Sequence, residues 1–451
     1  MTTRVLVPSG VLGLGFDEDA LWRGVALCPD IIAIDGGSTD SGPASLGTGT
    51  SKYSRASTKS EWRSLMKARA KANVPLVIGT CGTAGTNSNV DWMFEITREL
   101  ASELGQQLKV ARLYSEQPQR RIVQALHDGR LKPLDPAPEV DPGTIEKMTH
   151  IVALAGAEQI NEALATGADI ILAGRTTDTA IIAARALFNG DHPGGAWHGA
   201  KIGECGALCT THPTSGVIFI EFDDTGFRVT PLADKARCTP YSVSAHMLYE
   251  NADPMRLYEP GGYLDVSAAR YRQIDERSVR VEGAEWTPST AYCVKLEGAK
   301  QAGFQTTLLA VLRDPHYVEN AEIWAGKLTD FLNNEITHRL QMPRTDYVLD
   351  FRLMGVNSVL GAREVQQGTP NEVGVLCIVT AQSQEEASEI AKLINPFLLH
   401  YPLTEEEELP TFAFPYSPAH SERGAIFEFA LNLVLDLDHP MDAFQITVDE
   451  I

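Results

Sequence analysis

The chain has too few basic residues and cysteines for several common classes of protein. Its 451 residues include 38 Lys and Arg against 59 Asp and Glu, which gives a net charge of −21. Nucleic acids and anionic membrane surfaces attract basic proteins, so this balance argues against a partner of either kind. The seven cysteines are an odd number scattered along the chain and fit no disulfide framework, so we expect reduced thiols.

Long apolar runs are also missing. No stretch is long enough to span a bilayer, and the first residues lead into an expected strand without a secretory signal. We therefore expect a cytoplasmic protein. A hydrophobic fraction of 43% and a charged fraction of 22% are ordinary for a globular chain, and the length favours two domains.

One short phrase occurs twice, each time after a run of four apolar residues. The run at 31–34 precedes Asp35-Gly36-Gly37-Ser38-Thr39-Asp40, and the run at 170–173 precedes Gly174-Arg175-Thr176-Thr177-Asp178. Such runs predict buried parallel strands. Ligands of open α/β sheets bind beyond the carboxyl ends of the strands, so two similar polar loops predict a single site. The alternative is that these Thr and Asp residues only cap helices.

Strands, loops and helices alternate over the first part of the chain. This order predicts an α/β fold with a mainly parallel sheet and helices on both faces for residues 1–285. Residues 144–166 carry apolar positions at helical spacing and predict one long helix. Residues 286–451 predict a smaller α+β domain, an antiparallel sheet with helices on one face. Its expected helices are 318–333 and 384–395, and its expected strands include 347–354 and 373–380.

Small and hydroxyl-bearing residues of three loops are the predicted substrate-binding positions. Glycine lets the backbone approach a ligand closely, and hydroxyl and N–H groups bind anions. Arg175, at the end of an expected buried strand, is predicted to clamp a substrate carboxylate or phosphate, with an ion pair to Asp40 or Asp178 as the alternative. The predicted set is Gly36, Gly37, Ser38, Thr39, Thr80, Gly82, Thr83, Arg175, Thr176 and Thr177.

Four residues are the predicted catalytic groups, namely Asp40, Asp178, Glu204 and Cys205. The two aspartates could share a proton as an acid/base pair, or hold a hard cation such as Mg²⁺. Glu204 could act as acid or base if burial raised its pKa. Cys205 could be a nucleophile only if a positive neighbour lowered its pKa, and a small buried packing residue is the alternative.

Metal and cofactor sites are only weakly indicated. Cys205, Cys209 and His212 have loose spacing for zinc, and structural zinc uses four ligands, so the metal stays unassigned. The loop from Gly10 to Gly15 lacks the dinucleotide spacing, so NAD and flavin are not indicated. His246, like the other isolated histidines at 127, 150, 316 and 338, is expected to be structural.

The order of these motifs resembles the acyclic terpene utilisation protein A family over the N-terminal two thirds of the chain. The matching features are the Gly10–Asp17 loop, the two phrases, Gly203-Glu204-Cys205-Gly206 and the turn at 262–266. The resemblance implies carboxylic acid or CoA-thioester metabolism, because members accompany acyl-CoA carboxylases and hydratases, or di- and tricarboxylate catabolism. A small partner protein accompanies some members.

From these features we expect a hydratase or dehydratase (a lyase), or an isomerase, that acts on a small carboxylate or its CoA thioester. One alternative is an ATP- and Mg²⁺-dependent phosphotransferase or ligase, because Asp35–Thr39 is similar to the phosphate loop of the actin and sugar-kinase group. Another is a non-catalytic subunit that binds an acyl ligand within a catabolic complex. We also expect a homo-oligomer and a small partner subunit, with no nucleic-acid or membrane partner.

Overall fold

Ten strands form the largest sheet of the protein, whose structure is a computed structural model that describes residues 2–365 and 368–451. In order across the sheet they are β12 (Arg270–Gln273), β13 (Val279–Glu282), β9 (Gly226–Pro231), β8 (Ile218–Phe222), β1 (Thr3–Val7), β2 (Ile31–Asp35), β3 (Leu76–Gly79), β7 (Ile170–Ala173), β4 (Lys109–Tyr114) and β20 (Gln445–Glu450).

This sheet is mixed, so the prediction of a mainly parallel sheet was only partly correct. The central strands β1, β2, β3, β7 and β4 are parallel neighbours. The outer strands β8, β9, β13 and β12 on one side, and β20 on the other, pair antiparallel. The parallel part arises from the strand–helix alternation, whereas the outer strands are joined by turns or come from the C-terminal end.

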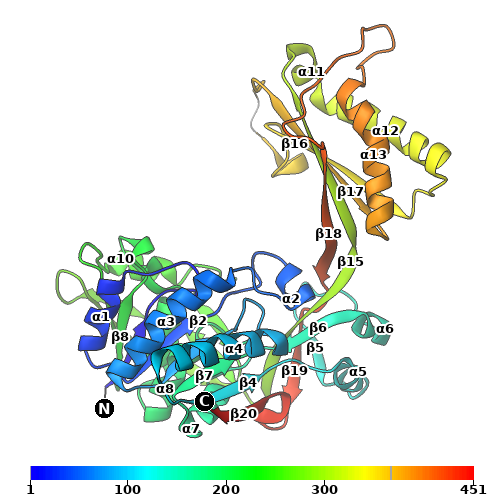
Figure 1. Cartoon of the computed structure of the whole chain (residues 1–451). Coiled ribbons are helices and arrows are strands. Elements are labelled where there is room, and N and C mark those ends of the chain that lie inside the picture. The colour runs from blue at the N-terminus through cyan, green and yellow to red at the C-terminus, as the bar shows by residue number, and fades with distance from the viewer. Residues whose placement is uncertain (1, 366–367) are drawn as a thin grey trace. The chain divides into compact units, whose positions relative to one another are not determined.

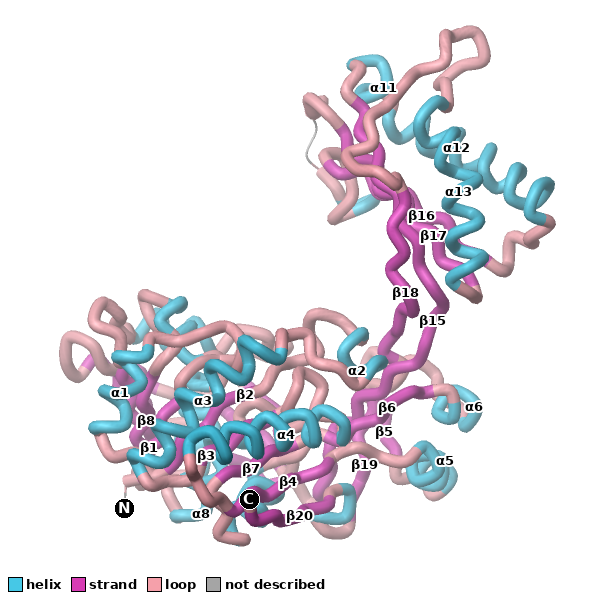
Figure 2. The backbone as a smooth tube through the Cα atoms, viewed as in Figure 1, coloured by secondary structure: helices cyan, strands magenta, loops and turns pink. Residues whose placement is uncertain are grey.

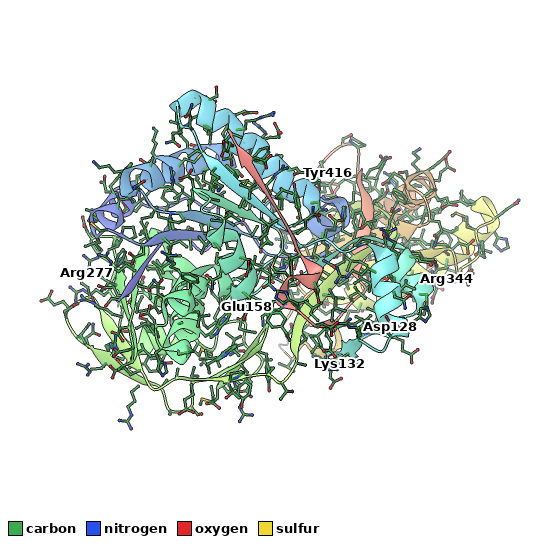
Figure 3. The ribbon with its side chains drawn as sticks, turned by 90° about the horizontal axis from the view of Figure 1, so that it is seen from below. Asp128, Lys132, Glu158, Arg277, Arg344 and Tyr416 are labelled. Atoms are coloured by element: carbon green, nitrogen blue, oxygen red, sulfur yellow. The ribbon has the colours of Figure 1, made fainter. Side chains whose placement is uncertain are left out.

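Helices cover both faces of the sheet. Ile32 and Ile34 pack with α1 (Glu18–Ala26), α3 (Arg55–Ala72) and α4 (Asn87–Leu104). Ile31 and Ala33 point the other way and pack with α7 (Ala157–Ala165), α8 (Ala180–Asn189) and α9 (Pro193–Gly203). Figures 1 and 3 show these layers, with the blue helices on one side of the sheet and green helices on the other. Burial on both faces explains why the central strands are apolar without alternation.

Residues 144–166 do not form the single helix that the sequence predicts. They include the end of α6 (Pro142–Glu146), the strand β6 (Met148–Ala153) and α7. Strand β6 pairs antiparallel with the first part of the long strand β15 (Tyr292–Leu312). Its β-branched residues Thr149, Ile151 and Val152 favour a strand, and pairing with a partner far along the chain overrode the apolar spacing.

Contacts between residues divide the chain into two units, Met1–Lys300 with Glu428–Ile451 and Gln301–Phe427. The first unit includes the C-terminal strands because β19 (Leu433–Leu437) pairs with β15 and with β5 (Leu131–Pro133), and because β20 pairs with β4. Figure 1 shows these red strands beside the cyan ones. The predicted domains 1–285 and 286–451 are a different division and stay a prediction.

The first unit also contains α2 (Ala44–Thr48), α5 (Gln119–His127), α10 (Pro240–His246) and a small antiparallel sheet of β10 (Arg256–Glu259), β11 (Gly262–Asp265) and β14 (Glu285–Pro288).

The second unit has an antiparallel sheet with helices, as expected (Figure 2). The second part of β15 pairs with β17 (Val373–Ala381), which pairs with β16 (Tyr347–Met354). Alternate residues of β17 are buried, and they pack against α12 (Ala321–Glu335) and α13 (Gln384–His400), so one face is covered. The unit also contains α11 (Pro315–Glu319) and most of β18 (His420–Phe429).

Across the described part of the chain, no helix has the length and apolar character needed to cross a membrane. The expected cytoplasmic location stays a prediction.

Candidate functional site

A cavity of about 500 Å³ lies beside the carboxyl ends of β1 and β2 and the loop that follows β7. Asp35 ends β2, and Ser38 and Asp40 follow it. Asp178 comes from the loop after β7. Binding sites of open α/β sheets occur at this position, because the ends of parallel strands leave polar loops along one edge. The two phrases of the sequence therefore meet at one cavity.

The four predicted catalytic residues, Asp40, Asp178, Glu204 and Cys205, all line this cavity, and so does the predicted substrate-binding residue Ser38. Glu204 caps the end of α9, and Cys205 follows it. The remaining walls come from the glycine-rich loop after β1, the segment that leads into α3 and the segments that follow α9 and α10. The structure thus brings together every side chain predicted to be catalytic, and their roles stay predictions.

The predicted substrate-binding residues Thr80, Gly82 and Thr83 belong to the loop after β3 and pack against the neighbouring segments. A Cβ atom on Gly36 would lie 2.6 Å from the carbonyl oxygen of Thr80, and one on Gly37 would lie 2.8 Å from Cα of Thr83. One on Gly82 would lie 2.8 Å from Cβ of Asn89. Small residues are needed here because backbones pack closely, and direct contact of these residues with a substrate stays a prediction.

Thr80 and Thr83 themselves adopt positive φ angles of 46° and 81°, an unusual conformation for a β-branched residue. Both are fully buried, and Thr80 Oγ1 accepts a hydrogen bond from the backbone N–H of Thr176 at 3.4 Å. Thr177 Oγ1 lies 3.1 Å from Thr179 Oγ1. The surrounding contacts hold this strained loop in place, and it fixes the spacing of the two phrases.

Arg175 is occupied by a partner that the sequence did not indicate. Its Nε and Nη2 atoms each donate to the carboxylate of Glu297 at 3.1 Å, and Nη1 lies 3.7 Å from Asp178. Thr39 Oγ1 donates to the same carboxylate at 3.1 Å. Glu297 therefore links the first phrase to the second. The predicted ion pair with Asp178 is a longer contact, and the predicted clamp on a substrate carboxylate stays a prediction.

Three carboxyl groups at the cavity lie in different surroundings. Burial, followed by the charge of Asp178, raises the pKa of Asp35 well above its usual value, and Oδ1 of Asp35 has no hydrogen-bond partner among the described residues. Withdrawal from water raises the pKa of Asp178, Arg175 lowers it and Asp40 raises it. Asp40 is exposed and accepts a hydrogen bond from Ser38 Oγ at 2.5 Å.

Glu204 forms a buried ion pair with Lys201, which the sequence did not single out. The Lys201 ammonium donates to Oε1 of Glu204 and to the carbonyl oxygen of Tyr249, the latter at 2.9 Å. Burial raises the pKa of Glu204 to about 8, although Lys201 acts in the opposite direction. Burial, Glu204 and Asp178 also raise the pKa of Cys205, and they outweigh the opposing charge of Lys201. A nucleophilic thiolate needs a lowered pKa, so the predicted nucleophilic role of Cys205 is disfavoured.

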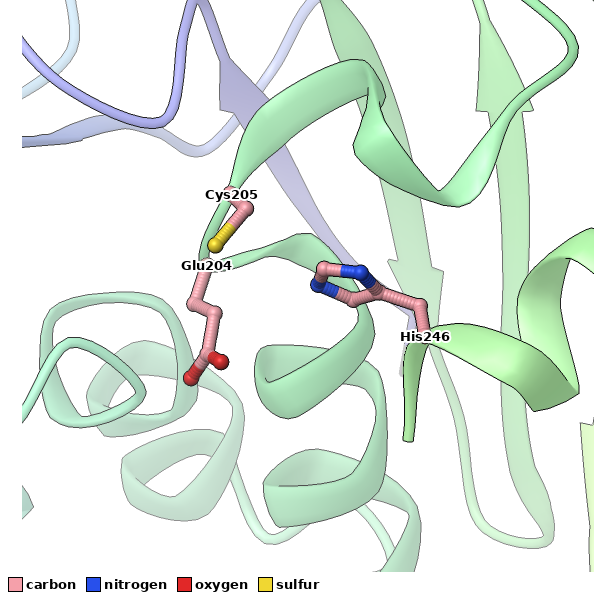
Figure 4. Close-up of side chains that lie close together, drawn as sticks. All are labelled: Glu204, Cys205 and His246. Atoms are coloured by element: carbon pink, nitrogen blue, oxygen red, sulfur yellow. The ribbon is translucent and has the colours of Figure 1, made fainter. Parts of the chain in front are cut away.

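His246, expected to be structural, lies next to Glu204 and Cys205 (Figure 4). It ends α10, is 5% exposed, and stacks on Tyr249 with ring centroids 5.4 Å apart. Burial, followed by the charge of Lys201, lowers the pKa of His246 to about 4, so the ring is neutral at pH 7. An isolated histidine in ordinary surroundings gives no local signal of such a neighbourhood.

Glu259 is another buried carboxyl near this region that the sequence did not indicate. It ends β10, and its Oε1 atom accepts a hydrogen bond from Thr179 Oγ1 at 2.5 Å. Burial raises the pKa of Glu259 to about 7. A Glu at the end of a short strand has no distinguishing pattern, whereas the apolar strand around Glu297 could have marked that residue as a buried charge.

A family model described as "Acyclic terpene utilisation family protein AtuA" matches residues 50–408, well over half of the chain. The match includes Arg175, Asp178, Glu204, Cys205 and His246, and begins after the first phrase. No curated protein and no solved structure shows a significant match to the chain.

Proposed function

Since the chain belongs to the AtuA family, which is implicated in acyclic terpene utilisation and therefore in catabolism, we propose that it is an enzyme of carboxylic acid or acyl-CoA catabolism. It adds or removes water, or moves a proton, on a small carboxylate or its CoA thioester. The observation that carries this proposal is the convergence of Asp35, Asp40 and Asp178 on one cavity at the carboxyl ends of the parallel strands.

Carboxyl groups in unlike surroundings can supply an acid and a base at the same pH. Desolvation and the charge of Asp40 raise the pKa of Asp178 against the opposing charge of Arg175, which suits Asp178 to hold and donate a proton. Asp40 is exposed and accepts a hydrogen bond from Ser38, which suits it to receive one. In a dehydration, Asp40 removes the proton next to the carbonyl group, and Asp178 protonates the departing hydroxyl group, which leaves as water. In an isomerisation, the same two groups move a proton between carbon atoms.

The cavity has room for a small acyl substrate. Its volume of about 500 Å³ lies within the range of about 300–1,000 Å³ typical of ligand sites. Val11, Leu14 and Leu208 give its wall apolar surface for a hydrocarbon chain. Lys52 also lines the cavity, and its ammonium group donates to Ser41 Oγ at 3.3 Å. It supplies a positive charge that can attract a substrate carboxylate or a developing enolate. Glu204 and Cys205 complete the wall.

Two amides of the glycine-rich loop after β1 already have a carboxylate partner. The backbone N–H groups of Gly13 and Gly15 donate to the carboxylate of Glu61, at 2.7 and 3.0 Å. A phosphate group would have to compete with this carboxylate for the same amides. This loop is therefore poorly suited to bind a phosphate group, whereas the phosphotransferase alternative rests on Asp35–Thr39 and is tested with ATP below.

Hydrogen exchange into a substrate tests the proposal directly. Thermal shift with di- and tricarboxylates, hydroxy acids, CoA thioesters and ATP, with and without Mg²⁺, first finds a ligand that stabilises the full chain. That ligand is then incubated in D₂O with the wild type, with Asp40→Asn and Asp178→Asn, and with Asp224→Asn, an exposed control. We expect deuterium uptake or hydration with the wild type and the control, and its loss in both site variants while binding is retained.

Three results would contradict the proposal. Full activity in both Asp40→Asn and Asp178→Asn would show that the site is wrong. Binding of an acyl ligand without turnover by the wild type, alone or with added partner, would indicate a non-catalytic subunit. Stabilisation by ATP with Mg²⁺ alone would indicate a phosphotransferase. The expected homo-oligomer and small partner subunit remain part of the proposal, and native mass measurement of the purified complex tests them.

A further inference from the structure

Glu204, Cys205 and His246 form a compact group of metal-ligating side chains. One ligand atom from each residue lies within 4.8 Å of the others. Glu204 and Cys205 follow α9, whereas His246 ends α10, so two helices present the group. Figure 4 shows the far edge of the His246 ring turned toward the other two side chains.

One ring nitrogen of the buried His246 side chain has no hydrogen-bond partner among the described residues. The residue is 5% exposed, and its Nε2 atom has no hydrogen-bond partner among residues 2–365 and 368–451. Leaving a buried polar atom unpaired is unfavourable, so native structures rarely contain one without a reason. Stacking on Tyr249 holds the ring in this orientation. An unpaired imidazole nitrogen in this position is suited to bind a cation.

The carboxylate of Glu204 is also oriented so that one of its oxygen atoms is available to a cation. Lys201 is bonded to its Oε1 atom, which fixes the carboxylate and leaves the second oxygen for another partner. Lys201 is itself 3% exposed and also donates to the carbonyl oxygen of Tyr249. Hydrogen bonds of this kind orient a metal ligand without binding the metal.

We propose that Glu204, Cys205 and His246 bind a divalent cation of the zinc class, with the fourth position open to the cavity. Zinc binds thiolate, imidazole and carboxylate at about 2.0–2.3 Å, so the ligand atoms need to move together by roughly 1 Å. The thiolate selects zinc over the hard ions Mg²⁺ and Ca²⁺. Three protein ligands and one open position are the usual arrangement of catalytic zinc.

The position of the group explains what the cation does there. Glu204 and Cys205 both line the cavity, where the exposed carboxylate of Asp40 would otherwise repel an anionic substrate. A dication at the open position offsets this negative charge and can hold a carboxylate or polarise a carbonyl oxygen. Glu204 and Cys205 then act as ligands, and proton transfer is left to Asp40 and Asp178.

This site differs from the two metal hypotheses drawn from the sequence. Cys209 is buried and its thiol donates to the carbonyl oxygen of Gly206 at 3.6 Å, while His212 is exposed. The Asp40 and Asp178 pair offers only hard oxygen ligands. The proposed cation also binds independently of the reaction, so its test does not depend on turnover.

Cobalt titration of the full chain tests the site. The protein is stripped with a chelator, and Co²⁺ alone is added while the thiolate-to-cobalt charge-transfer band is recorded. We expect one equivalent to produce the band in the wild type, and Zn²⁺ to displace it. Cys205→Ser should abolish the band. His246→Gln should weaken Co²⁺ binding by more than the roughly 10- to 100-fold that loss of a supporting residue costs.

Cys209→Ala and His212→Gln are the controls, because they change the same residue types as the ligand variants and both lie close to Cys205 in the chain. Both should retain the band and the affinity. Absence of the band in the wild type, its survival in Cys205→Ser, or its loss only in the Cys209 variant would each overturn the proposal. Circular dichroism of every variant separates loss of the metal site from loss of the fold. If a variant does not fold, the presence or absence of the charge-transfer band in the wild type still tests the site.

Discussion

Replacing Glu259 by Gln should stabilise the protein at neutral pH but not at acidic pH. Glu259 is 9% exposed, its Oε1 atom accepts a hydrogen bond from Thr179, and its Oε2 atom has no partner among the described residues. Ionising such a group is costly, and burial raises its pKa to about 7. Glutamine keeps an oxygen that can accept from Thr179 and cannot ionise.

The sign and size of the effect follow from proton binding. The unfolded chain releases this proton near its ordinary pKa of 4.5, whereas the folded chain keeps it up to about pH 7. The folded state therefore binds more protons between these values, and its stability falls as the pH rises through them. At about 1.4 kcal/mol per pKa unit, the wild type should lose about 3 kcal/mol relative to the variant over this interval.

Urea unfolding below about pH 5 and near about pH 8 measures this difference. Fluorescence and circular dichroism should give coincident transitions, so that the free energies can be compared. Any cost of the new amide group is independent of pH and cancels between the two conditions. Glu162→Gln, an exposed change on α7, should show no pH-dependent difference from the wild type. An equal difference between Glu259→Gln and wild type at both pH values would refute the reasoning.

Other buried contacts give further predictions. Glu297→Gln removes the charged bidentate partner of Arg175 and should lower the free energy of unfolding, measured by urea titration, by about 3–5 kcal/mol. The exposed change Glu285→Gln is the control and should alter this free energy by less than about 0.5 kcal/mol. Glu61→Ala leaves two amides of the glycine-rich loop without their carboxylate, so hydrogen–deuterium exchange of residues 10–16 should accelerate. Thr86→Ala removes the N-cap of α4 and should cost about 1 kcal/mol, measured by thermal melting, while Thr86→Ser should restore most of it.

Local patterns in the sequence were sufficient for much of the fold. The apolar runs at 31–34 and 170–173 became buried parallel strands, and the strands and helices of the second unit lie close to their expected bounds. Patterns of this kind reflect burial on one or both faces, which each segment carries in its own residues. The order of strand, polar loop and helix also brought Asp40 and Asp178 to one cavity, because parallel strands end at the same edge of a sheet.

The tertiary structure alone decided which distant groups meet. Glu297 reaches Arg175 across 122 positions of the sequence, and His246 reaches Glu204 and Cys205 from another helix. Strand β20 joins the main sheet from the opposite end of the chain. Neither periodicity nor composition carries such information, because the pairing of two side chains depends on the packing of whole elements. The sequence by itself therefore determined the central parallel strands, the polar loops that follow them and the edge of the sheet where the cavity lies, whereas the pairs formed by the charged groups around the cavity were set by long-range packing.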